Sequence, residues 1–165
     1  MNIQELTAKE ASIESKMPKG GYFEERDEYL KKNGLYEEWR KVFIQYSQLA
    51  KEGELEALKR AIFFCWYQCA EPNSLSGLLG LDEIHIHDVL TEAEKLSGSN
   101  ELDSELKFML PFYYQVCNWY FERFEGLHYL LEASLQNNAL WEAEAPKYDW
   151  KNRGIMGDYW SSKGL

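Results

Sequence analysis

The feature that most constrains the fold of this chain is its shortage of β-branched residues. Val, Ile and Thr together number only 12 in 165 residues, whereas Leu and Glu number 21 and 22. Strands favour β-branched side chains, and helices favour Leu and Glu. A large sheet is therefore not expected, and the sequence predicts an all-α protein.

Apolar side chains recur at three- and four-residue steps in six to seven segments, which is the spacing of amphipathic helices. Clusters of Gly, Pro, Asn and Ser separate these segments. The predicted helices cover residues 2–16, 22–32, 35–51, 54–69, 82–96, 101–124 and 127–141. Residues 61–67 are apolar all round, so we expect the fourth helix to lie in the middle. Pro111 should kink or split the sixth helix after residue 110.

The helices are expected to form a compact irregular bundle, with stacked helical hairpins of the HEAT type as the alternative. A weak similarity between residues 58–66 and 106–114, at an offset of 48, would fit the hairpins, but a compact bundle explains the same pattern. The length favours a single domain. We expect that domain to span residues 1–165, with an N-terminal helix at 1–17, a hinge at 18–21, a helical body at 22–145 and an irregular tail at 146–165.

The negative charge is concentrated in one part of the chain. The net charge is −10, and residues 81–145 alone carry 13 acidic and 3 basic side chains. Such a surface disfavours nucleic acid and anionic membranes and favours a basic or mixed-charge protein partner. A surface that only keeps the protein soluble is the alternative. The acidic residues expected to contact a partner are Glu83, Asp88, Glu92, Glu94, Glu132 and Glu142.

The tail is rich in aromatic residues but has no helical period. Trp150, Arg153 and Trp160 belong to residue types that dominate protein interfaces, so we include them among the candidate partner contacts. The alternative is a tail that folds back over a groove on the bundle.

Two short patterns are compatible with a metal site. Asp82 and His85 are three residues apart, as are Glu125 and His128, and Glu-x-x-His is the spacing found in di-iron bundles. A metal-binding bundle or metal-dependent enzyme that uses His85, Glu125 and His128, with Glu122 as a further ligand, is therefore the alternative function. Residues that cap helix ends explain the same pattern.

No catalytic motif of a hydrolase, P-loop protein, dinucleotide-binding enzyme or zincin occurs in the sequence, and we expect neither enzymatic activity nor a cofactor. Cys65, Cys69 and Cys117 lie on apolar faces and are expected to act as small hydrophobic residues. No apolar run reaches the about 20 residues of a membrane span, and the first residues do not form a signal peptide. A cytoplasmic location is therefore expected.

The combination of small size, acidic charge and helical pattern without catalytic motifs resembles bacterial toxin-neutralising proteins of the immunity type. The resemblance is one of composition and involves no specific residues. It implies a protein without enzymatic activity that blocks the basic active-site cleft of a nuclease-like toxin.

Overall fold

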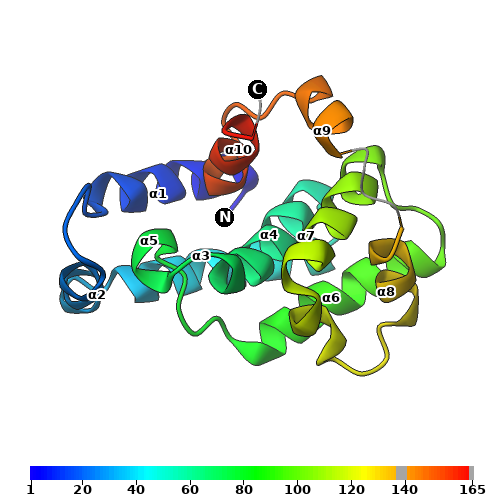
Figure 1. The fold of residues 1–165 in the computed structure, drawn as a ribbon, viewed down its shortest axis with the longest axis horizontal. Helices are drawn as coiled ribbons and strands as arrows, with labels where there is room; N and C mark the ends of the chain where they lie inside the picture. The colour runs from blue at the N-terminus through cyan, green and yellow to red at the C-terminus, as the bar shows by residue number, and fades with distance from the viewer. Residues whose placement is uncertain (137–140, 164–165) are drawn as a thin grey trace.

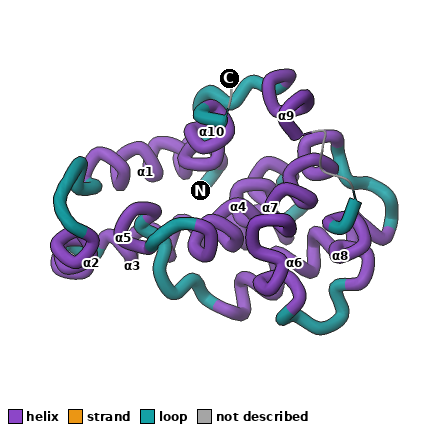
Figure 2. Tube along the Cα trace, viewed as in Figure 1, coloured by secondary structure: helices purple, strands orange, loops and turns teal. Residues whose placement is uncertain are grey.

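The computed structural model describes residues 1–136 and 141–163, and every regular element in these ranges is a helix (Figures 1 and 2). The all-α prediction is confirmed. The elements in chain order are α1 (Ile3–Lys16), α2 (Phe23–Lys32), α3 (Leu35–Lys51), α4 (Leu55–Ala70), α5 (Asn73–Ser76), α6 (Glu83–Gly98), α7 (Ser104–Glu122), α8 (His128–Ser134), α9 (Trp141–Glu144), the 3-10 helix η1 (Ala145–Lys147) and α10 (Gly154–Ser161).

The helices pack as a compact bundle around α4, as the apolar pattern of this helix predicted. Ten consecutive residues of α4, from Ala57 to Trp66, are buried. The helix packs against α3, α6 and α7, and α10 also contacts it. Two of these buried residues, Lys59 and Arg60, are cationic. A buried cation requires an acidic partner within the bundle.

Short polar side chains cap the N-termini of α1, α6 and α7. Asn2 and Glu5 form a capping box at the start of α1. Asp82, predicted to begin a helix, accepts hydrogen bonds from the backbone N–H groups of Ile84 and His85. These caps satisfy backbone donors that have no partner within the helix.

The sequence predicted that Pro111 would kink or split the sixth helix after residue 110, and this position is wrong. The helix α7 is continuous at Pro111 and is kinked at Cys117 instead, where φ is −139° and ψ is 58°. Pro111 is buried, and α7 packs against α4 and α8. This packing offsets the hydrogen bond that proline cannot donate.

The tail is neither irregular throughout nor displayed. Residues 154–161 form α10, which lies beside α1 in Figure 1, and the side chains of Trp150 and Trp160 pack inside the bundle. The prediction of an irregular tail is wrong for this segment, because tertiary packing stabilises a helix with two glycines that has little intrinsic propensity. The helix expected over 127–141 ends at Ser134, and residues 137–140 lie outside the described part.

None of the helices in the described ranges has the length and apolar character needed to cross a membrane.

Candidate interaction surface

One tryptophan lies at the surface of the described structure. Trp119, on the C-terminal half of α7, is 55% exposed, and Val116, three residues before it and across the kink at Cys117, is also exposed. The other five tryptophans are buried or half-buried. A large aromatic side chain that is exposed in the most acidic part of the chain is typical of a site that contacts another molecule.

An ion pair links α7 to the start of α6 close to Trp119 in the chain. The guanidinium of Arg123, one turn after Trp119, lies 3.2 Å from the carboxylate of Glu83 at the start of α6. The same guanidinium lies over the rings of Tyr120 and Phe124. Ile84, the residue after Glu83, is 72% exposed. We call the set Glu83, Ile84, Val116, Trp119, Glu122 and Arg123 the Trp119 surface.

Most of the acidic residues predicted to contact a partner are engaged within the chain. Besides Glu83, the carboxylate of Asp88 pairs with Lys51 at 2.9 Å and that of Glu92 with Lys95 at 2.7 Å. These surface pairs reduce the negative field that the sequence predicted.

The carboxylate of Glu94 caps the start of α8, because it accepts hydrogen bonds from the backbone N–H groups of Tyr129 and Leu130. Glu132 and Glu142 are exposed, and neither forms an ion pair with the described residues. Of the six predicted acids, these two are therefore the ones that keep their charge available to a partner.

The tail residues predicted as partner contacts face inward. Trp160 is fully buried, and its ring lies 5.3 Å from that of Phe108 and 5.8 Å from that of Trp150. Arg153 binds the carboxylates of Glu56 and Glu105 at 2.5 and 2.8 Å. In this structure the three residues hold the tail onto the bundle and are not available to a partner.

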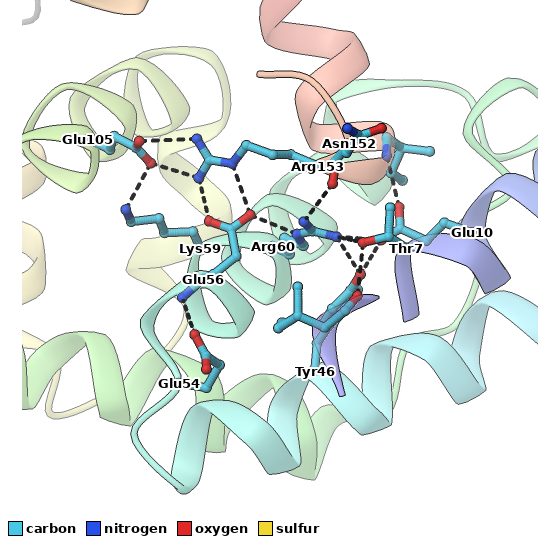
Figure 3. A network of polar contacts seen from close by, with 12 residues as sticks. Thr7, Glu10, Tyr46, Glu54, Glu56, Lys59, Arg60, Glu105, Asn152 and Arg153 are labelled. Atoms are coloured by element: carbon cyan, nitrogen blue, oxygen red, sulfur yellow. Dashed lines mark hydrogen bonds and ion pairs between the residues drawn. The ribbon is translucent and has the colours of Figure 1, made fainter. Parts of the chain in front are cut away.

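Arg153 belongs to a buried network of charges that joins α1, α3, α4 and α7 to the tail (Figure 3). Arg60 is at its centre: its guanidinium contacts Glu56 at 2.8 Å, the hydroxyl of Tyr46 at 3.0 Å and the carbonyl of Asn152 at 3.2 Å. Lys59 contacts Glu105 at 2.8 Å. Because these charges are paired, their mutual attraction offsets the free-energy cost of removing them from water.

Glu10, which lies on α1 and is fully buried, is the last residue of this network. Its carboxylate accepts hydrogen bonds from the Tyr46 hydroxyl and from the backbone N–H of Ile155. Burial raises the pKa of Glu10 to about 7 despite these contacts and the nearby Arg60. These contacts fix the tail on the bundle, and the charged groups of the network pair with one another.

The network was not predicted from the sequence, although the sequence contains one signal for it. Lys59 and Arg60 directly precede the most apolar stretch of the chain. Cations on a helix expected to be covered on several sides require acidic partners. Glu56 could have been proposed for Arg60, since it lies four residues before it on the same helix, but the partner of Lys59 was not predictable, because Glu105 lies 46 residues away.

The residues predicted to bind a metal do not come together. Nδ1 of His85 lies 2.7 Å from a carboxylate oxygen of Asp82. Gly126, with φ of +80°, separates Glu125 from α8, which begins at His128, so the Glu-x-x-His spacing does not lie on one helix. In residues 1–136 and 141–163, no group of three or more His, Cys, Asp or Glu side chains is arranged to hold a metal ion.

Comparison with models of protein families, with curated proteins and with solved structures gives no match to this chain, so its function is inferred from its own geometry.

Proposed function

We propose that this chain is a protein-binding domain without enzymatic activity, which contacts a basic or mixed-charge protein through the Trp119 surface. The observation that carries the proposal is the exposure of Trp119, at 55%, within the segment that holds 13 acidic and 3 basic residues. Tryptophan supplies a large apolar contact area, and surrounding acidic groups accelerate association with a basic partner and orient it.

The acidic groups nearest in the chain to Trp119 are Glu122 and Glu125, and both are exposed. Glu132 and Glu142 are further exposed acidic residues, on α8 and α9. In its most concrete form, the proposal is that the domain neutralises a nuclease-like toxin by covering its basic active-site cleft. The composition of the chain supports this form.

Capture of partners from a lysate of the source organism tests the proposal, with Trp119→Ala compared against Phe23→Ala. Phe23 is a matched control because it is 57% exposed and lies on α2, outside the Trp119 surface. We expect one stoichiometric basic protein to be captured by the unchanged chain and by Phe23→Ala. It should be lost with Trp119→Ala and weakened by high salt or by Glu122→Lys.

Equal capture by the two aromatic variants would contradict the assignment of Trp119. Capture that does not respond to salt or to Glu122→Lys would contradict the role of the acidic groups.

A further inference from the structure

A cleft between α1 and α3 is lined by apolar side chains and by two lysines. It has a volume of about 310 Å³, and the two helices that form it pack against each other. Neither helix contributes a residue to the Trp119 surface. The lining residues that bear on the argument are Met1, Leu6, Lys9, Lys41, Val42 and Ile44.

Lys9 differs from the other lysines of the chain in its combination of burial and pairing. Every lysine except Lys9 and Lys59 is exposed. Lys59 is buried, and its ammonium group pairs with Glu105 at 2.8 Å. Lys9 is half-buried, yet it forms no ion pair with any described residue. Taking part of a cation out of water costs free energy unless an anion compensates for it, so this position favours an anion from outside the chain.

The acidic side chains one turn before the two lysines are engaged elsewhere. Glu5, four residues before Lys9, accepts a hydrogen bond from the backbone at the start of α1. Glu37, four residues before Lys41, pairs with Arg40 at 2.7 Å. The other carboxylate oxygen of Glu37 lies 3.8 Å from Nζ of Lys41, which is beyond hydrogen-bond distance. An ammonium group has three donors, so both lysines keep donors for an anionic ligand.

The cleft also presents apolar surface. Met1 is 56% exposed and Ile44 is half-buried, so both offer hydrocarbon surface to a ligand, and Leu6 and Val42, which also border the cleft, are buried. A small inorganic anion would gain nothing from these side chains, whereas a hydrocarbon chain would be removed from water by them. The ligand that matches the cleft therefore has one anionic group and an apolar chain.

We propose that the cleft binds a medium-chain carboxylate, such as octanoate. Its carboxylate would accept hydrogen bonds from the ammonium groups of Lys9 and Lys41, whose flexible stems let both reach it. Its hydrocarbon chain would lie against Met1 and Ile44. The net charge of −10 opposes approach to an anionic membrane, so the ligand is the free carboxylate and not a lipid in a bilayer. The inference goes beyond the protein-binding proposal, since it involves other helices and does not depend on Trp119.

The methyl resonances of Met1 and Ile44 in ¹³C-labelled protein provide a direct test. Four probes are titrated: octanoate, acetate, octylammonium, and vesicles of phosphatidylglycerol. We expect a saturable shift of these resonances with octanoate. Acetate lacks the chain and octylammonium carries the opposite charge, so both should bind at least about tenfold more weakly. The vesicles should not bind the protein.

The double variant Lys9→Gln, Lys41→Gln should bind octanoate at least about tenfold more weakly, because both cations are removed. The matched control is Lys32→Gln, Lys107→Gln, which changes the net charge equally and should bind as the unchanged chain does. Both control lysines are exposed, and neither lines the cleft. Octylammonium binding with equal affinity, equal effects of the two double variants, vesicle binding without octanoate binding, or no saturable shift with octanoate would overturn the proposal.

Discussion

The carboxylate of Glu10 accepts a hydrogen bond of 2.8 Å from the backbone N–H of Ile155, which lies 145 residues away in the sequence. This hydrogen bond joins α1 to the first turn of α10, where the tail returns to the bundle. Gly154, the residue before Ile155, lies against the same carboxylate, and its φ is +60°. The contact therefore depends both on a buried acid and on a position without a side chain.

Replacement of Gly154 by alanine should destabilise the fold strongly. An added Cβ would lie 2.1 Å from Oε2 of Glu10, so either the carboxylate or the tail must move. We expect a loss of at least about 3 kcal/mol in the free energy of unfolding, measured by urea denaturation. Gly34→Ala is the matched control: its φ is +67° and nothing lies within 4 Å of the added Cβ. It should cost only about 1 kcal/mol, and an equal loss in both variants would show that the carboxylate contact is unimportant.

The stability of the protein should fall as the pH rises from about 4.5 to about 7, through the titration of Glu10. Its pKa is raised from 4.5 to about 7 in the folded state, chiefly by burial. The folded state thus holds a proton that the unfolded state releases in this range. The stabilising contribution is complete below pH 4.5 and is lost as the pH passes 7, with a total of about 3 kcal/mol.

Urea denaturation of the unchanged chain and of Glu10→Gln across this pH range isolates that contribution. Glutamine keeps an oxygen that can accept the N–H of Ile155 but does not titrate. The difference in unfolding free energy between the two proteins should therefore change with pH. A constant difference would mean that Glu10 is ionised in the folded protein throughout the range.

Arg153→Ala should destabilise the fold far more than Arg123→Ala. Arg153 is mostly buried, and its removal leaves the carboxylates of Glu56 and Glu105 with fewer partners, at a cost of about 3 kcal/mol. Arg123 forms one ion pair at the surface, with Glu83, and its loss should cost about 1 kcal/mol or less. Chemical denaturation of both variants measures the contrast. Similar losses would show that the buried network adds nothing beyond a surface pair.

The thiols of the native protein should react slowly with a disulfide reagent at pH 8. Cys69 is the most exposed of the three cysteines, yet burial raises its pKa to about 11, and burial also raises the pKa of Cys65. The thiolate fraction of Cys69, and with it the rate, should be about a hundredfold below that of free cysteine. All three thiols should react quickly in denaturant. A thiol that reacts quickly in the native protein would reopen the question of a nucleophilic role.

The long helices were predictable because their apolar residues repeat at a constant spacing. The predicted bounds of α3 agree with the structure at both ends, and α4 has its expected central position. The same reasoning was wrong where the period changes. Val116 and Cys117 both fit the apolar spacing of the helix predicted over residues 101–124, but the backbone leaves helical geometry at Cys117, and Val116 is exposed.

The candidate site could be predicted only in part. The acidic segment was evident from the sequence, but ion pairs such as Asp88 with Lys51 depend on packing between helices. The choice of aromatic contacts failed for a related reason. A short segment with glycines has no detectable period, so the sequence alone could not decide between a displayed tail and one folded back on the bundle, and the burial of Trp160 supports the second alternative.

Two tryptophans in opposite environments give a final prediction. Trp160→Ala removes a fully buried ring that packs against Phe108, Phe112 and Trp150, and the resulting cavity should cost about 3 to 5 kcal/mol. Trp119→Ala removes a ring that is 55% exposed and should change the unfolding free energy by about 0.5 kcal/mol or less. Thermal and urea denaturation of the two variants provide the comparison. A large loss with Trp119→Ala would mean that this side chain stabilises the fold, and its exposure could then no longer be taken as evidence for a partner.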